Sequence, residues 1–386
     1  MENKITSKTA FIIALAIFFG LAGGVVGELL ARVYLIDSLY NVPLYGDINY
    51  SGLNTRSNLI ISGGRQVVVE QNDKIISTVN SVRGGLAGIY KKQASLNAKN
   101  FTPVDFYKAK EAIGQALALT SDGWLVTSFQ LSDKPAEFGQ YVAITNDNKV
   151  YVIDRVVKDK FSKFVFFHIA IRDLPVTRFA PAGAVKNGEL LIAADWQGIA
   201  WSSSVIDANN YIGAIFSDLP QDRVVLKDVL PKDLSAAAVF NLAGETVALI
   251  DGEGRIEPIS HFSAAINSLF RLKAIRRPSL GVYYLSADSL VASTDKIAAG
   301  NADLAAGRGA VIYKDAKGGA VVKGSAAEKA GLKDGDTILT VDGTELGHGN
   351  NLSNLLQAFS IGEKITVDYL RNGEKKEIQV TIGELK

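Results

Sequence analysis

Short apolar segments separated by turn residues occupy the chain from about residue 85 to residue 250. They read GLAGIYKK, GQALALTSDGWLVTSFQ, YVAITNDNKVYVIDRVV, FVFFHIAI, ELLIAADW, IAWSSSVID, YIGAIFS and AAAVFNLAGETVALI. Their length and the hairpin turns TSDG and TNDNK are typical of β-strands. Many short strands at regular spacing predict an all-β barrel or sandwich, and the length of the region favours two barrels in tandem.

One long apolar run lies near the N-terminus. Residues 10–27, AFIIALAIFFGLAGGVVG, carry no charge, and eighteen residues are about the minimum that crosses a bilayer core as a helix. Lys4 and Lys8 precede the run, so the positive-inside rule predicts a cytoplasmic N-terminus and main domains outside the cytoplasm. A cleaved signal peptide is the alternative, although GELLARVYLID offers no clean small-x-small cleavage site.

Composition narrows the classes of function. The 386 residues are 47% hydrophobic, and 41 basic against 40 acidic residues give a net charge of +1, so no nucleic-acid partner is expected. Cysteine is absent, which excludes disulfides, Cys-based zinc sites and thiol catalysis. His168, His261 and His348 are scattered, without a carboxylate at helical or hairpin spacing, so neither a metal nor a cofactor is expected.

The ends of the extracytoplasmic region have different patterns. NVPLYGDINYSGLNTRSN is rich in loop-forming residues, QVVVEQ predicts a short strand and DKIISTVNSV has helical spacing. Near the C-terminus, VVKGSAAEKAGLKDGDTILTVDGTEL predicts a strand, a short Ala-rich helix and a turn into another strand. NNLSNLLQAF then predicts a helix with Leu352, Leu355, Leu356 and Phe359 on one face, and Asn372–Gly373 predicts a tight hairpin.

In this order the segments resemble the HtrA family of trypsin-like serine proteases, in the membrane-anchored, single-PDZ architecture of its DegS-like members. ALTSDGWLVTSFQL is similar to the hairpin that ends in the catalytic histidine, FVFFHIAIRDLPV to the strand of the catalytic aspartate, and PKDLSAAAVFNLAGETVALI to the nucleophile loop. The resemblance implies a mainly β protein, a trypsin-like double β-barrel followed by a PDZ domain and preceded by one transmembrane helix. Its expected parts are a cytoplasmic tail 1–9, an anchor 10–30, a tether 31–65, a protease-fold domain 66–272, a linker 273–278 and a PDZ domain 279–386.

The resemblance places altered residues at the catalytic positions. Gln130 stands at the general-base position, His168 at the orienting-acid position, and Ser235 keeps the identity of the nucleophile. A serine hydroxyl needs a base to accept its proton and a carboxylate to hold that base, and an amide has no useful basicity. His168 behind Gln130 would lie beyond direct reach of Ser235, so only a bridging water would connect them.

The expected oxyanion loop is altered as well. Asp233 stands two residues before Ser235, where glycine aims a backbone N–H into the cleft, and Ala236–Ala237 replace the usual Gly-Gly. The Asp233 carboxylate would repel a developing oxyanion. Three altered catalytic elements predict a remnant nucleophile and an inactive, membrane-anchored binding protein. An active serine endopeptidase of extracytoplasmic protein quality control, with a histidine that enters the site on activation, is the alternative.

The PDZ-like part implies peptide binding. Ser279-Leu280-Gly281-Val282 match the loop that binds a C-terminal carboxylate, so a partner strand would pair beyond Gly281. Arg276 and Arg277 are expected to attract the carboxylate. The helix is expected to contribute Leu352, Leu355 and Leu356 to the groove, and sequence does not divide its groove face from its core face.

Assembly and one insertion complete the expectations. The family's members form trimers through the start of the barrel domain, so a homotrimer is expected through aromatic side chains of a long loop, or these rings pack on their own barrel. Those side chains are Tyr90, Phe101, Phe106 and Tyr107. The Ala-rich insertion over residues 286–308 of the PDZ region has helical stretches and no assigned role.

Overall fold

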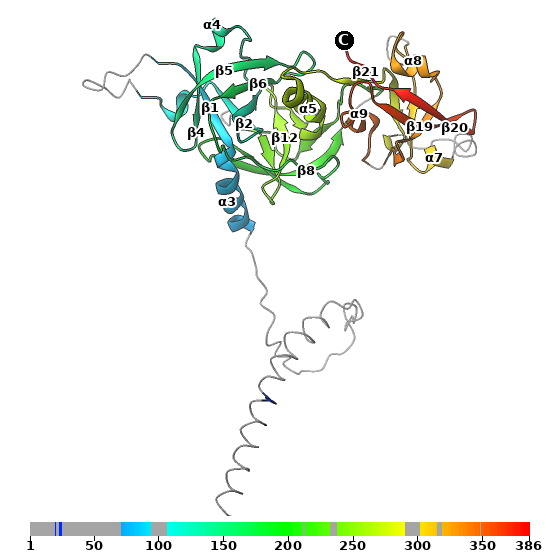
Figure 1. The fold of residues 1–386 in the computed structure, drawn as a ribbon. Coiled ribbons are helices and arrows are strands. Elements are labelled where there is room, and N and C mark those ends of the chain that lie inside the picture. The colour runs from blue at the N-terminus through cyan, green and yellow to red at the C-terminus, as the bar shows by residue number, and fades with distance from the viewer. Residues whose placement is uncertain are drawn as a thin grey trace, which may run out of the picture. The chain divides into compact units, whose positions relative to one another are not determined.

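The computed structural model divides into two units, Met1–Val67 and Val68–Lys386. It describes residues 20, 23–24, 71–93, 106–210, 213–231, 238–289, 302–314, 319–347 and 349–386, so the architecture is that of the second unit (Figure 1). No helix among these residues is long and apolar enough to span a membrane. Apart from Gly20, Gly23 and Gly24, the expected anchor lies outside the described residues, as does the whole tether.

A closed six-stranded barrel follows helix α3 (Gln71–Val82), with the strand order β1-β2-β3-β6-β5-β4 (Figure 1). Its strands are β1 (Leu86–Lys91), β2 (Gly114–Ala118), β3 (Trp124–Thr127), β4 (Tyr141–Thr145), β5 (Val150–Lys158) and β6 (Val165–Ile169), and α4 (Pro135–Phe138) precedes β4. All five residues of β2 and all four of β3 are buried, because one face fills the barrel and the other meets the second barrel domain.

The second half of the protease-fold domain is a six-stranded sheet in the order β10-β8-β7-β11-β12-β13. Its strands are β7 (Leu190–Ala194), β8 (Ala200–Asn210), β10 (Arg223–Leu226), β11 (Ala238–Phe240), β12 (Thr246–Ile250) and β13 (Ile256–Pro258). Helix α5 (Ser263–Leu272) closes the domain, and its apolar face joins an apolar cluster with residues of both halves, among them Leu117, Phe240 and Leu269. The predicted mainly β, trypsin-like domain is confirmed.

A PDZ domain forms the C-terminal part, with its own apolar cluster. Its strands are β14 (Pro278–Ser279), β15 (Tyr283–Ser286), β16 (Ala310–Ile312), β17 (Thr337–Val341), β18 (Thr344–Glu345), β19 (Lys364–Arg371), β20 (Glu374–Thr381) and β21 (Gly383–Glu384). Its helices are α7 (Ala302–Ala305), α8 (Ala326–Ala330) and α9 (Leu352–Leu356). Figure 1 shows α8 beside the long β19–β20 hairpin.

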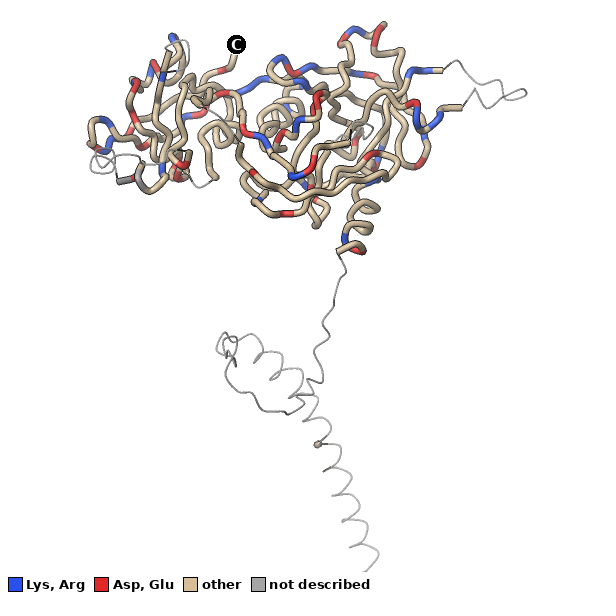
Figure 2. Tube along the Cα trace, turned by 180° about the vertical axis from the view of Figure 1, so that it is seen from behind, with Lys and Arg blue, Asp and Glu red and all other residues tan. Residues whose placement is uncertain are grey.

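Local signals explain two of these elements. Asn372 and Gly373 both have positive φ, 55° and 80°, as a type I′ turn requires, and they connect β19 to β20 in register. The Ser325 side chain accepts a hydrogen bond from the Glu328 N–H and so caps the start of α8. Basic and acidic residues are interspersed over these domains (Figure 2).

One expected barrel strand belongs elsewhere. YIGAIFS was expected to add to the barrels, but its strand β9 (Ile215–Phe216) pairs antiparallel with β15 and extends the PDZ sheet. The prediction was wrong because an alternating apolar pattern specifies a strand and not the sheet that it joins.

The aromatic residues expected to mediate trimer formation occupy other places. Tyr90 lies in β1 instead of a loop and is 2% exposed. Its ring packs edge-on against Tyr107 at 5.5 Å and near Trp196 at 6.1 Å, so two of the four rings are satisfied within their own domain. Phe106 is 47% exposed, and Phe101 lies outside the described residues.

Candidate functional site

A cleft of about 730 Å³ lies where the two halves of the protease-fold domain meet. The first half contributes the segments 113–115 and 128–130, and the second contributes 229–231 and 250–254. Gln130 lines this cleft together with Pro231, four residues before Ser235. The cleft therefore brings the expected general-base position to the start of the expected nucleophile loop. Asp233, Ser235, Ala236 and Ala237 lie outside the described residues.

The Gln130 amide is an exposed group with two backbone partners. Its Nε2 donates to the Lys163 carbonyl at 2.7 Å and to the Ser128 carbonyl at 3.1 Å. Both contacts use the amide as a donor. A donor of this kind can orient a hydroxyl or a peptide but cannot accept the proton of a serine.

The register of β3 and β6 shows where His168 lies relative to Gln130. Trp124 pairs with His168, and the last pair of the ladder is Thr127 with Val165. In an antiparallel pair the partner moves backward as the first strand moves forward, so His168 lies at the far end of the pair from Gln130. The structure therefore does not bring Gln130 and His168 together, and the residue before β6 that Gln130 contacts is Lys163.

His168 has its own partners at the other end of that strand pair. Its Nδ1 lies 2.7 Å from an Asp154 carboxylate oxygen, and its Nε2 lies 3.0 Å from the Asp122 carbonyl. The β5–β6 pairing is irregular between Ile153 and Arg155, which is where Asp154 lies. The sequence pattern missed this carboxylate because an irregular ladder shifts the cross-strand partner by one residue.

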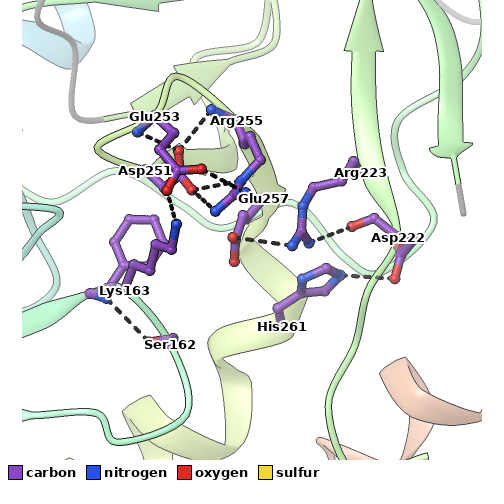
Figure 3. Close-up of polar contacts among 10 residues, drawn as sticks. Ser162, Lys163, Asp222, Arg223, Asp251, Glu253, Arg255, Glu257 and His261 are labelled. Atoms are coloured by element: carbon purple, nitrogen blue, oxygen red, sulfur yellow. Dashed lines mark hydrogen bonds and ion pairs between the residues drawn. The ribbon is translucent and has the colours of Figure 1, made fainter. Parts of the chain in front are cut away.

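Charged side chains, and not the expected catalytic carboxylate alone, lie next to the Lys163 carbonyl that Gln130 contacts. Lys163 forms an ion pair with Glu253 and thereby lowers the pKa of that carboxyl, and Glu253 also pairs with Arg255 at 2.7 Å (Figure 3). A lysine beside the base position disfavours an imidazolium there, the opposite of what a triad aspartate does. Lys163 and Glu253 lie 90 residues apart, and sequence spacing gave no sign of their contact.

His261 forms a buried pair with Asp222 (Figure 3). Its Nε2 lies 2.9 Å from Asp222 Oδ1, and both residues are 3% exposed. Burial raises the pKa of the Asp222 carboxyl, but the charge and hydrogen bond of His261, with the Asn354 amide, outweigh it and hold the pKa below 3.8. Because Asn354 lies in α9, this pair belongs to the contact between the protease-fold and PDZ domains, and His261 is held there. His348 lies outside the described residues.

The two arginines expected to attract a peptide carboxylate are used elsewhere. Arg276 pairs with Glu384 at the surface. Arg277 is 2% exposed and pairs with Asp159 of the first barrel, and it also donates to the His261 carbonyl and the Gln357 amide. That expectation was wrong for both residues.

The expected peptide-binding residues occupy one edge of the PDZ domain. Ser279 to Val282 connect β14 to β15, and Leu280 and Gly281 direct their N–H groups at the Asp218 carboxylate. Leu352 and Leu356 are fully buried in the PDZ core, and Leu355 is partly buried against it. Asp218 was not foreseen, because no local motif marks it.

Comparisons with known proteins agree with this architecture. A PDZ domain family model matches residues 278–382. The chain is 26% identical over 289 residues to a probable periplasmic serine endoprotease DegP-like of Hahella chejuensis, covering 71% of this chain and 58% of the relative. A protein of the same description from a Marinomonas species is 25% identical over 287 residues, covering 71% and 57%. The chain thus spans less than three fifths of these relatives.

Solved structures of the HtrA-type protease AlgW are also similar to this chain. The complex with a decapeptide has a TM-score of 0.48 at 17% identity, covering 81% of this chain and 99% of that one. The complex with a tripeptide has a TM-score of 0.48 at 18% identity, covering 81% and 97%. The ordered sequence segments, the barrel domain, the PDZ match and the named relatives together show that the chain is similar to the HtrA/DegP-like serine protease family, with a single PDZ domain.

Proposed function

We propose that this chain is a membrane-anchored, catalytically inactive member of its family that binds exposed or C-terminal peptides outside the cytoplasm. The observation that carries the proposal is Gln130 in the cleft, an amide that donates to two backbone carbonyls where the mechanism needs a proton acceptor. His168 and His261 are held by Asp154 and Asp222, so among the described residues no histidine serves the cleft. The periplasmic naming of the relatives supports the extracytoplasmic location.

Peptide binding is assigned to the PDZ domain. The N–H groups of Leu280 and Gly281 bind a carboxylate, that of Asp218, and the edge of β15 accepts a strand, β9, so the loop and the edge have the chemistry of a peptide site. The role is that of a sensor, scaffold or chaperone-like factor. A single-pass anchor over residues 10–30 and a homotrimer remain parts of the proposal.

The first test is labelling with a fluorophosphonate probe, which reacts only with a serine activated by a base and an oxyanion hole. The full-length chain should not be labelled, while an active trypsin-like protease in the same assay is labelled. The Ser235→Ala variant should match the parent in stability and in peptide binding. Strong labelling of the unmodified chain that Ser235→Ala abolishes would establish the active endopeptidase instead, the activity for which the relatives are named.

A restoration series tests the register of the site. Gln130→His with Lys163→Asp should supply the base and its orienting group, yet turnover should stay low, because each missing oxyanion donor reduces the rate about 100- to 1000-fold. Glycine at Asp233, Ala236 and Ala237 in addition should bring back hydrolysis of an unfolded substrate. The matched series with His168→Asp in place of Lys163→Asp should be slower by about 10⁴-fold, because a carboxylate at residue 168, opposite Trp124, cannot reach the base.

A further inference from the structure

The segment between β8 and β10 leaves the protease-fold domain and pairs with the PDZ sheet. Phe216 pairs with Tyr283 and Ile215 with Tyr284, both antiparallel, and the Ser217 N–H donates to the Val282 carbonyl at 2.8 Å. The rings of Phe216 and Tyr283 lie 4.9 Å apart. Residues 215–217 thus occupy the edge of β15 that strand addition would use.

The Asp218 carboxylate fills the loop at the start of that edge. Its Oδ1 accepts hydrogen bonds from the N–H groups of Leu280 at 2.8 Å and Gly281 at 2.9 Å, and its Oδ2 accepts from the Ser279 hydroxyl at 2.5 Å. Asp218 is 1% exposed. Three donors from consecutive residues around one buried carboxylate form a built anion site.

Helix α9 holds the same segment from the other side. The Gln357 amide, just beyond α9, donates to the Asp218 carbonyl at 3.4 Å, and the Asn354 amide donates to Asp222 at 3.1 Å. Ile215 is 2% exposed and belongs to the same apolar cluster as Leu352 and Leu356. The segment therefore lies between β15 and α9, in the expected peptide groove.

The direction of the segment is that of a bound C-terminal peptide. It runs antiparallel to β15 and reaches the loop with a carboxylate, and the side chain of Asp218 stands where a peptide would place its terminal carboxylate. Much of the contact is polar, through Ser217, Asp218 and Gln357, and the donors that hold the Asp218 carboxylate can hold the carboxylate of a peptide in the same way. A peptide that offers the same hydrogen bonds can therefore exchange with it.

We propose that residues 213–218 are a built-in pseudo-ligand that closes the PDZ groove. Peptides with a free C-terminal carboxylate bind only by displacing this segment. The inference rests on the proposed peptide-binding function of the PDZ domain. Because the segment belongs to the same chain, its effective concentration at the groove is high and most molecules are closed. The apparent affinity for a peptide is the affinity of the open groove multiplied by the fraction of molecules that are open.

The test uses the full-length chain and a fluorescein-labelled peptide Gly-Ala-Ile-Phe-Ser, copied from residues 213–217, whose terminal carboxylate would take the place of Asp218. Fluorescence polarisation gives its affinity, with the C-terminal amide as the control peptide. The Asp218→Ala variant should bind the acid about tenfold more tightly than the parent, as expected if about one molecule in ten is open. Asp133→Ala, which removes an exposed aspartate of the first barrel, should match the parent.

A disulfide gives the second arm. Phe216→Cys with Tyr283→Cys joins two directly paired positions in a chain that has no other cysteine. The oxidised protein should not bind the peptide, and reduction of the same sample should restore binding. Equal peptide affinity of the parent, Asp218→Ala and the oxidised protein would overturn the inference, since Asp218 would then be only a structural brace.

Hydrogen exchange separates the inference from the function on which it rests. In the parent, fragments that cover residues 278–284 should exchange slowly, and in Asp218→Ala they should exchange faster, whether or not any peptide binds. If the exchange behaves so but no open variant binds the peptide, the peptide-binding function fails while the closed groove stands. Rapid exchange of these fragments in the parent would refute the pseudo-ligand by itself.

Discussion

Two adjacent residues, Arg276 and Arg277, have the same charge and very different surroundings. Arg276 pairs with Glu384, and the two side chains are 46% and 32% exposed. Arg277 and Asp159 have side-chain exposures of 3% and 0%. Exposed ion pairs contribute little because water competes for both charges, whereas removing one member of a buried pair leaves an unpaired charge in a medium of low polarity.

We therefore expect Asp159→Asn to lower the free energy of unfolding by about 3 kcal/mol, the lower end of the range for a broken buried pair. Glu384→Gln, which removes the partner of the neighbouring arginine, should leave the free energy of unfolding nearly unchanged. Urea unfolding of both variants beside the parent measures the difference. Equal losses in the two variants would contradict the assignment of Asp159 to a buried ion pair.

The Asp222–His261 pair predicts a pH dependence. Because the folded state lowers the pKa of Asp222 below 3.8, the pair contributes stability in full above pH 3.8, and this contribution is lost as the pH falls through the lower folded-state pKa. Asp222→Asn should lower the free energy of unfolding by about 1–2 kcal/mol at pH 7, since a buried hydrogen bond to a charged group is lost. The gap between parent and variant should shrink near pH 3, and a gap that grows on acidification would contradict the prediction.

At the scale of elements, the loop from β14 to β15 depends on a glycine with no room for a side chain. Gly281 has φ of +82°, and a Cβ there would meet Ser325 Cβ at 2.3 Å. Gly335 has a similar φ of +87° with nothing within 4 Å of its Cβ position. The two glycines therefore separate the effect of backbone conformation from that of steric clash.

Gly335→Ala should lower the free energy of unfolding by about 1–2 kcal/mol, the effect of a left-handed conformation alone. Gly281→Ala should cost about 1–3 kcal/mol more, because the added methyl group also displaces Ser325 at the start of α8. The displaced loop should also lose its carboxylate contacts, so Gly281→Ala should weaken binding of the test peptide. Thermal or urea unfolding of the two variants gives the comparison, and indistinguishable losses would rule out the steric contribution.

At the scale of the whole molecule, the expected anchor determines the topology. If residues 10–30 span the membrane with the N-terminus in the cytoplasm, protease added to intact spheroplasts should remove the globular part, because that part lies outside. A cytoplasmic marker protein in the same sample should remain intact. A globular part that is degraded only after lysis would contradict this topology, and its release as a soluble form beginning between residues 24 and 40 would point to cleavage.

Local patterns in the sequence determined much of the architecture. Apolar runs bounded by turn residues located most strands of the barrels, and the Asn372–Gly373 turn located the last hairpin, because strand formation and turn geometry depend on neighbouring residues. Residue type alone also indicated that Gln130, at the expected general-base position, cannot accept a proton. These features depend on residue type and short-range spacing alone.

Only the tertiary structure decided which distant groups meet. The strand register placed His168 opposite Trp124 and away from Gln130, and the packing of distant segments brought Asp222 to His261, 39 residues away, and Asp218 to Leu280, 62 residues away. The partner of a buried polar group depends on how separate elements pack, which one segment's pattern does not encode. For the same reason the sequence indicated that GAIFS forms a strand, while only the packing of two domains showed that this strand pairs with β15, at the edge of the expected peptide groove.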